Sequence, residues 1–130
     1  ATTYIYTLSL HDALPISSLR IRGQPTGRLV LNREPFPFQF EQVTAKAVAK
    51  GVALEINASP ERLDLSPPLV RAAKRLGARF TISTDAHHPR HLSNMYFGVQ
   101  MARRGWLEAG DVLNTLPLAQ FEQAIRARPI

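Results

Sequence analysis

Cysteine is absent from this chain of 130 residues, which excludes disulfides and thiolate metal sites. Acidic residues are also scarce, with 10 against 16 basic ones, so the net charge is +6. No apolar run reaches the roughly 20 residues that a membrane span needs. These absences fit a cytoplasmic protein of one ordinary domain. The basic charge is compatible with a polyanionic partner such as DNA, although a solvated helix face explains it equally well.

Short strands and helices are expected to alternate along the chain. Strands are expected at residues 19–22, 51–57 and 80–84, where β-forming residues cluster. Helices are expected at residues 39–50, 67–76, 92–102, 111–116 and 118–128. Among their side chains, Leu76, Leu92, Phe97 and Val99 are expected to face the core. The alternation predicts an α/β fold with parallel strands and crossover helices.

The segment Asp85-Ala-His87 follows the strand expected at residues 80–84. If the chain stays extended, residues i and i+2 point to the same side, so the two side chains would converge. A carboxylate oxygen beside an imidazole nitrogen suits a divalent metal such as Zn or Mn. In α/β proteins the C-terminal edge of the sheet is also where sites are built. The alternative is a loop in which Asp85 caps the next helix and His87 is a surface residue.

Several further motifs occur in a fixed order around this segment. They are Pro25-Thr-Gly-Arg28, Gly51–Asn57, Arg62-Leu-Asp-Leu65, Asn94–Gly98, Ala102–Trp106 and Asp111–Leu116. Over about residues 19–130 the series resembles the C-terminal part of the polymerase and histidinol phosphatase (PHP) domain of bacterial and archaeal family X DNA polymerases. The resemblance implies a C-terminal fragment of a distorted (β/α)7 barrel. It also implies a metal-dependent phosphoesterase that acts as a 3′–5′ exonuclease beside a polymerase module.

The metal ligands that the resemblance implies are only partly present. Asp85 and His87 match the family's last metal motif, Asp-x-His. An earlier motif has His immediately before Pro-Thr-Gly-Arg, and this chain has Gln24 there. An amide oxygen is a neutral and much weaker ligand than imidazole for Mn or Zn, and Mg is a third possible ion. His88 and His91 flank the motif, and we expect them to be exposed or to begin a helix.

Three more residues are candidates for supporting the metal or for holding the substrate phosphate. The guanidinium of Arg28 matches phosphate geometry, although it would equally well pair with Glu34 or with a helix C-terminus. Glu55 and Asn57 share one face of their expected strand and point towards the same edge as Asp85. We expect Glu55 to support a ligand or the fold rather than to bind metal directly. No residue is assigned as the catalytic one.

The first 17 residues differ in character from the rest. Tyr6–Ile16 resembles one reading frame of a synthetic adapter used in short-read DNA sequencing, and residues 1–3 are consistent with it. A secretory signal would need a positive start and an apolar run that His11 and Asp12 interrupt. A natural strand is the other alternative, because residues 4–10 include β-forming types. We therefore expect residues 1–17 to be non-native, residues 18–130 to be the C-terminal PHP portion, and His11 and Asp12 not to be ligands.

Two further functional interpretations remain open beside the exonuclease. In the first, the parent protein uses the PHP-type module only to support an attached polymerase and has lost a ligand at Gln24. In the second, it is a stand-alone phosphatase of small phosphate esters. In each case the partners are the missing N-terminal half of the barrel and, for a polymerase parent, the polymerase module. The fragment alone is expected to be inactive, because two or three ligands cannot position several metal ions.

Overall fold

The computed structural model describes residues 19–35 and 39–126. At its centre is a parallel sheet whose strands lie in the order β1 (Ile21–Arg22), β2 (Ala53–Asn57), β3 (Phe80–Ser83). Leu54 pairs with Phe80 and Asn57 with Ser83, so β2 and β3 end level with each other. The predicted α/β class is confirmed, with each strand inside a region where the sequence indicated one. Residues 1–18, which include His11 and Asp12, lie outside the described residues.

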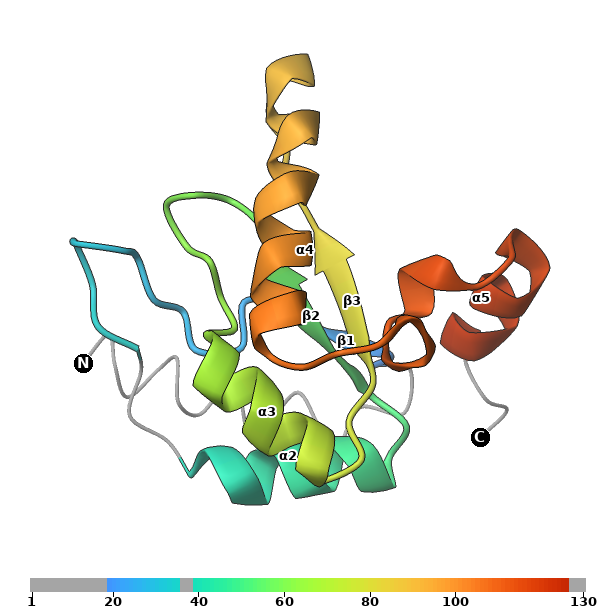
Figure 1. Ribbon diagram of the computed structural model, residues 1–130. Coiled ribbons are helices and arrows are strands. Elements are labelled where there is room, and N and C mark those ends of the chain that lie inside the picture. Colours follow the sequence, from blue (N-terminus) through green and yellow to red (C-terminus); the bar gives the residue numbers. More distant parts are fainter. Residues whose placement is uncertain (1–18, 36–38, 127–130) are drawn as a thin grey trace.

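Helices connect the strands and follow the last of them (Figure 1). The α-helices are α2 (Phe40–Ala49), α3 (Pro67–Arg75), α4 (Met95–Arg104) and α5 (Leu118–Ile125). Three 3₁₀ helices accompany them: η1 (Pro89–Asn94), η2 (Ala109–Asp111) and η3 (Leu113–Thr115). The α-helices expected at 92–102 and 111–116 are thus partly wrong. The first begins with the 3₁₀ turn of η1, and the second is replaced by short 3₁₀ segments, which suit tight connections.

The core forms where the helices pack on the sheet. Ile56, Val70 and Phe80 are completely buried within one apolar cluster. Gly98 brings α4 against β3, since a Cβ on this glycine would lie 2.4 Å from the Cγ2 of Ile82. The absence of a side chain at Gly98 therefore sets how closely α4 approaches the sheet.

Several side chains that were expected in the core are instead exposed. They are Leu76, Leu92, Phe97 and Val99, with exposed fractions of 39%, 63%, 42% and 39%. Leu76 is the C-cap of α3, where the helix has already ended. The other three lie on η1 and α4, which extend past the end of the sheet (Figure 1). The side of α4 that meets the sheet is formed by Gly98, Met101 and Ala102, which are buried. Phe97 and Val99 flank Gly98 and lie to either side of this contact, so the spacing indicated a helix but not the side that it buries.

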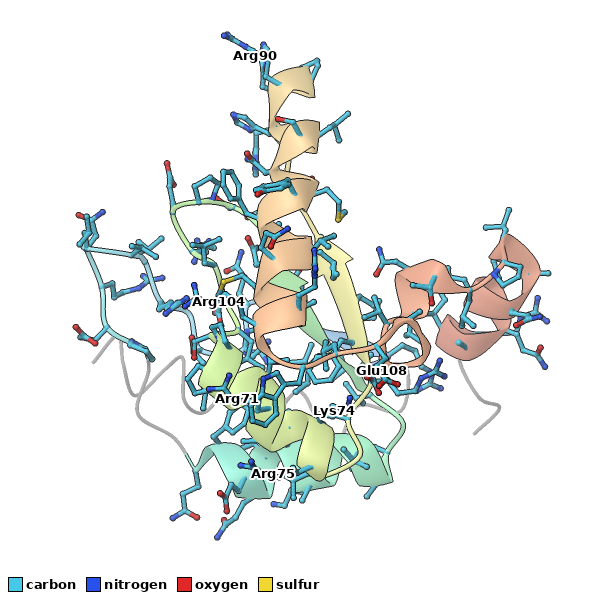
Figure 2. All side chains as sticks on the ribbon, viewed as in Figure 1. Arg71, Lys74, Arg75, Arg90, Arg104 and Glu108 are labelled. Carbon is cyan, nitrogen blue, oxygen red and sulfur yellow. The ribbon has the colours of Figure 1, made fainter. Side chains whose placement is uncertain are left out.

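Basic side chains gather on α3 and at the end of α4. Arg71, Lys74 and Arg75 project from α3, and Arg104 lies where α4 ends (Figure 2). Their spacing of three and four residues places the α3 cations on one side of that helix.

Among the described helices, none has the length and hydrophobicity that a membrane crossing requires.

Candidate functional site

Asp85 and His87 lie just beyond the C-terminal end of β3, but not in the expected conformation. The strand ends at Ser83, and Asp85 has a φ of 55°, in the left-handed region. The extended chain that would align residues i and i+2 therefore stops before the pair begins, and that part of the prediction is wrong. A contact unites the two residues instead: the Nδ1 atom of His87 lies 2.7 Å from the backbone oxygen of Asp85.

A pocket of about 580 Å³ opens beside this pair. It is lined by Ser59, Pro60, Glu61, Arg62, Thr84, Asp85, His87, His91 and Asn94. On its floor, the Nε atom of Arg62 lies 4.0 Å from the Oδ2 atom of Asp85. Asn57 ends β2 and donates from Nδ2 to the same oxygen over 3.5 Å. The Asp85 carboxylate therefore faces one cation and one amide donor of the protein itself.

The flanking histidines have the local structural roles that the sequence indicated. His88 is the N-cap of η1, and its Nδ1 accepts a hydrogen bond from the backbone N–H of Arg90. The Nδ1 of His91 accepts from the backbone N–H of His87 at 3.1 Å. Both side chains are exposed, and the second of these bonds fixes the backbone that carries His87.

Arg62 belongs to the pocket although sequence reasoning did not select it as a site residue. Its Nη1 atom is buried and has no hydrogen-bond partner among the described residues. The segment Arg62-Leu-Asp-Leu65 was noted only as one motif of a resemblance. A basic residue in the loop after an expected strand was the available signal, and it was too common to stand alone.

Asp64 is the second residue that sequence reasoning missed. Its carboxylate is completely buried and accepts hydrogen bonds from the backbone N–H and hydroxyl of Thr26 and from the backbone N–H of Gly27, at 2.8–3.3 Å. Burial raises the pKa of Asp64, and the Thr26 and Gly27 donors and the charge of Arg28 oppose that rise. Asp64 thereby ties the turn after β1 to the loop after β2.

Arg28 holds the same loop from the other side. Its Nε donates to the carbonyl oxygen of Arg62 at 2.9 Å, and its Nη2 donates to that of Leu63. Neither of these was an expected partner. The guanidinium fork is thus engaged with the backbone that positions Arg62, which gives Arg28 a structural task close to the site.

Gln24 and Glu55 meet at the end of β1. The backbone N–H of Gln24 donates to the Oε2 of Glu55 at 2.8 Å, and Gln24 has a φ of 44°. Glu55 also interacts electrostatically with Arg22. Burial lowers the pKa of Arg22, and the negative charges of Asp64 and Glu55 oppose this shift. Glu55 is therefore a partner of the backbone and of an arginine. Gln24 is not among the residues that line the Asp85 pocket.

The donor set at the pocket suits a divalent metal in type but is incomplete. A carboxylate and an imidazole are suitable ligands for Mn or Zn. Within residues 19–35 and 39–126, however, no three His, Asp or Glu side chains gather closely enough to hold one ion. Catalytic metal sites of this kind generally use at least three protein ligands. The described residues thus bring together two side chains of a suitable type, fewer than such a site uses.

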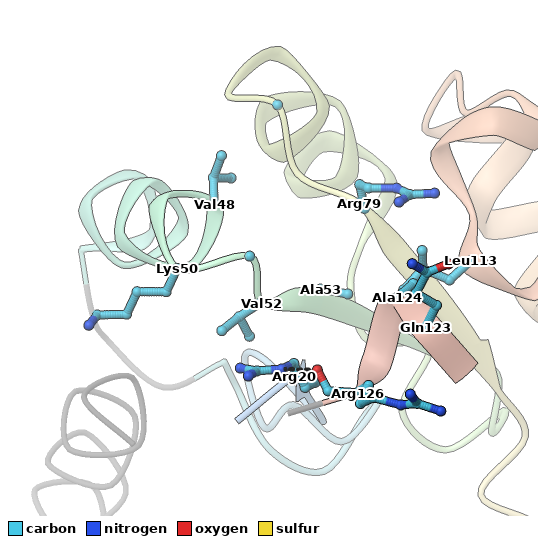
Figure 3. Close-up of a pocket in the computed structure, with 12 residues that line it drawn as sticks. Arg20, Val48, Lys50, Val52, Ala53, Arg79, Leu113, Gln123, Ala124 and Arg126 are labelled. Carbon is cyan, nitrogen blue, oxygen red and sulfur yellow. Dashed lines mark hydrogen bonds between the residues drawn. The ribbon is translucent and has the colours of Figure 1, made fainter. Parts of the chain in front are cut away.

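A second pocket, of about 340 Å³, lies at the opposite end of the sheet, where the strands begin (Figure 3). Arg20, Lys50, Arg79 and Arg126 are among its lining residues, and no acidic side chain is. The basic side chains do not converge, since Lys50 extends to one side and Arg79 and Arg126 to the other (Figure 3). Arg20 donates to the backbone oxygen of Arg126 at 3.0 Å. The basic side chains of this pocket therefore form no focused anion site.

Comparison with known proteins places the chain beside one DNA-processing enzyme. No protein-family model matches it. The chain is 37% identical over 117 residues to the DNA polymerase/3′-5′ exonuclease PolX of Bacillus subtilis (strain 168). The match covers 90% of this chain but only 20% of that protein's length. The chain is therefore related to a segment of a PolX protein and spans about one fifth of it.

Proposed function

We propose that this chain is the C-terminal part of a PHP-type phosphoesterase domain in a cytoplasmic protein of the PolX kind, and that the domain removes nucleotides from the 3′ end of DNA. One observation carries the proposal. Asp85 and His87 lie together at the C-terminal edge of a parallel sheet, in a chain related to a protein named for a 3′-5′ exonuclease. The three strands would form part of a distorted (β/α)7 barrel.

In the intact domain, Asp85 and the free ring nitrogen of His87 would hold a divalent ion, Mn, Zn or Mg, together with ligands from other segments. Such an ion supplies Lewis acidity and makes a bound water more acidic. Gln24, which stands where the resemblance implies a His, offers a neutral oxygen at most. Asn57 orients the Asp85 carboxylate through its Nδ2 donor.

Arg62 is the residue that we assign to the substrate phosphate. Arg62 lines the pocket, and its Nε atom lies 4.0 Å from the Asp85 carboxylate. A planar guanidinium presents several donors that match phosphate oxygens. Arg28 and Asp64 keep the Arg62 loop in place through the hydrogen bonds described above. The phosphodiester would thus be held between Arg62 and the Asp85–His87 pair.

A non-catalytic structural module is the second candidate, and a specific observation favours it. The Asp85 carboxylate already faces the Arg62 cation at 4.0 Å, so it has a partner without any metal. Gln24 in place of a His also removes one expected ligand. In that case the module would support an attached polymerase and would perform no chemistry.

A chimeric protein separates the two candidates. The matched segment of the Bacillus subtilis protein would be replaced by this chain, and Mn-dependent shortening of 5′-labelled single-stranded DNA would be measured. Asp85→Asn in the chimera should lower the rate by more than about tenfold, since even residues that only support metal ligands contribute that much. Glu41→Gln, an exposed acid in the first turn of α2, is the matched control and should leave the rate unchanged.

Each outcome of this experiment supports or overturns one of these assignments. A folded chimera that shortens DNA at the same rate with and without Asp85→Asn would overturn the role of this site. A folded chimera with no exonuclease activity, while the unaltered Bacillus protein remains active under the same conditions, would support the structural module. Cleavage of an aryl phosphate ester but not of DNA would point to the small-ester phosphatase.

A further inference from the structure

Trp106 is the only tryptophan of the chain, and it lies on the surface. It follows α4 directly, and 68% of its area is exposed. Its φ of 64° is in the left-handed region, which bulky residues seldom adopt. Such a conformation persists only where the surrounding structure imposes it, and strained backbone of this kind is concentrated at functional sites.

The surroundings of Trp106 do impose its position. Lys74 donates from Nζ to its backbone oxygen at 2.7 Å, and its own N–H donates to the backbone oxygen of Arg103 at 2.9 Å. The preceding Gly105 presses against α3, since a Cβ there would lie 2.3 Å from a methyl carbon of Val70. The indole is therefore carried by a backbone fixed to two helices, which makes it a rigid platform.

Positive charge surrounds this platform. The guanidinium carbon of Arg71 lies 4.8 Å from the indole centroid, in cation–π contact, and Arg71 also donates to the backbone oxygen of Arg104 at 2.8 Å. The basic residues of this surface are Arg71, Lys74, Arg75 and Arg104, on α3 and the end of α4 (Figure 2). The acids nearby are fewer: Asp111, which pairs with Lys74 at 3.0 Å, and Glu108.

From this arrangement we infer that the surface around Trp106 binds single-stranded DNA, with one base stacked on the indole and the neighbouring phosphates held by the cations of α3 and α4. An aromatic ring within a basic surface is the usual platform for single strands. A duplex keeps its bases stacked inside and offers no free base face to a ring on a protein surface. The choice of DNA over RNA rests on the proposed function.

The surface is separate from the pocket of Asp85. Trp106 follows the C-terminal end of α4, whereas η1 and the Asp85 segment precede its N-terminal end (Figure 1). Ten helical residues lie between, which corresponds to about 15 Å along the axis. The surface would therefore hold a strand several nucleotides away from the phosphate that reacts at the Asp85 pocket.

The single tryptophan makes binding directly measurable. Intrinsic fluorescence of the full chain would be followed while oligothymidylate of twelve nucleotides is added, in EDTA and at low salt. We expect saturable quenching by the single strand and much weaker quenching by a duplex that contains the same strand. Because the measurement needs neither metal nor hydrolysis, its failure is distinguishable from failure of the proposed function.

Variants test the stacking and the charges separately, with dye-labelled oligothymidylate and anisotropy as the readout. Trp106→Ala should weaken binding by about 5- to 150-fold, the range for one stacked base, and Trp106→Phe should recover part of this loss. Replacing the exposed Arg75 and Arg104 by Gln should reduce the slope of log affinity against log salt by about 1.4, since each phosphate contact on a single strand contributes about 0.7.

A matched pair of basic residues on another helix provides the control. Lys46→Gln with Lys50→Gln removes two exposed charges at the end of α2 and should change the salt slope much less. The inference is overturned if no binding occurs at low salt, or if Trp106→Ala and Trp106→Phe both bind as tightly as the parent chain. Equal quenching by duplex, or an equal change in slope for both double variants, overturns it as well. Circular dichroism confirms that each variant is folded.

Discussion

A single buried carboxylate, Asp64, connects two loops that follow different strands. It receives donors from Thr26 and Gly27, which lie in the turn after β1, while its own backbone pairs with Asn57 at the end of β2. Buried polar groups of this kind are stable only while each has its partner. Asp64 therefore decides the position of the Arg62 loop without lining the pocket.

Replacing Asp64 by Ala should destabilise the fold strongly. The change leaves the buried N–H and hydroxyl of Thr26 without their Asp64 acceptor, and each such loss costs about 1–3 kcal/mol. The N–H of Gly27 loses its bond to Asp64 but keeps the backbone oxygen of Gln24 at 3.2 Å. Urea denaturation would measure the free energy of unfolding. Glu61→Ala, an exposed acid in the same loop, should change it by less than about 0.5 kcal/mol. Equal unfolding free energies for both variants would contradict this role of Asp64.

The pKa of Asp64 also predicts how stability depends on pH. Because burial raises the pKa in the folded state, the folded protein retains the proton at pH values where the unfolded chain has lost it. The contribution of Asp64 is therefore fully present below the unfolded pKa of about 3.9 and is lost as pH rises through the folded pKa. Urea titrations at several pH values would give the free energy of unfolding of the parent chain and of Asp64→Ala. The difference between the two values should shrink as the pH rises from the unfolded pKa to the folded pKa of Asp64. A difference that grows with pH would reverse the assigned direction.

At the scale of elements, the packing of α4 on the sheet depends on Gly98. A Cβ at this position would lie 2.4 Å from the Ile82 side chain and 2.8 Å from that of Ala58. Ile82 lies near the end of β3, and Ala58 directly follows β2. The distance between α4 and the sheet is thus set by the one residue type that has no side chain.

Gly98→Ala should therefore lower the free energy of unfolding by about 1–3 kcal/mol, the usual cost of forcing extra volume into a packed core. This occurs despite a gain of about 1 kcal/mol in helix propensity. Gly110→Ala is the matched control, because no atom lies within 4 Å of a Cβ placed there. Thermal unfolding followed by circular dichroism compares the two. A Gly98→Ala variant as stable as the Gly110→Ala variant would show that the helix can shift without cost.

A side chain, rather than a strand, covers the outer edge of β3 at one residue. Asn114 accepts from the backbone N–H of Ile82 at 2.8 Å and donates to its backbone oxygen at 3.0 Å. Uncovered strand edges pair with other chains. Asn114→Ala should therefore speed amide hydrogen exchange at Ile82 and increase light scattering at high protein concentration.

Asn114→Asp separates the two hydrogen bonds of that contact. It keeps the acceptor for the Ile82 N–H but loses the donor to the Ile82 oxygen. Its exchange rate at Ile82 should fall between those of the parent chain and Asn114→Ala. Identical exchange in all three proteins would show that the Asn114 side chain does not protect the edge.

At the scale of the whole molecule, the chain alone should not hydrolyse phosphate esters. Hydrolysis with metal ions requires several ligands in fixed positions, and the described residues bring together only Asp85 and His87. The assay would supply Mn with single-stranded DNA and with an aryl phosphate ester. Turnover above a metal-only control that vanishes in Asp85→Ala would show that two ligands suffice.

By itself the sequence determined the class of the fold and indicated where a candidate site would lie. Alternating patterns located β2 and β3, Pro67 marked the start of α3, and Asp85-x-His87 marked the end of the last strand. These are local signals, because propensity and spacing act over a few residues. The helical spacing of α4 was also visible, although it did not reveal that the helix meets the sheet through Gly98, Met101 and Ala102.

Only the tertiary structure decided which side chains meet. The contact of Arg62 with Asp85 joins residues 23 positions apart, and that of Thr26 with Asp64 joins residues 38 apart. No periodicity connects such positions, since they come together only when β1, β2 and β3 pair. The left-handed conformation at Asp85 likewise changed how the pair converges. Burial and long-range pairing, which depend on the whole chain, therefore determined the surroundings of a site whose location local sequence had already indicated.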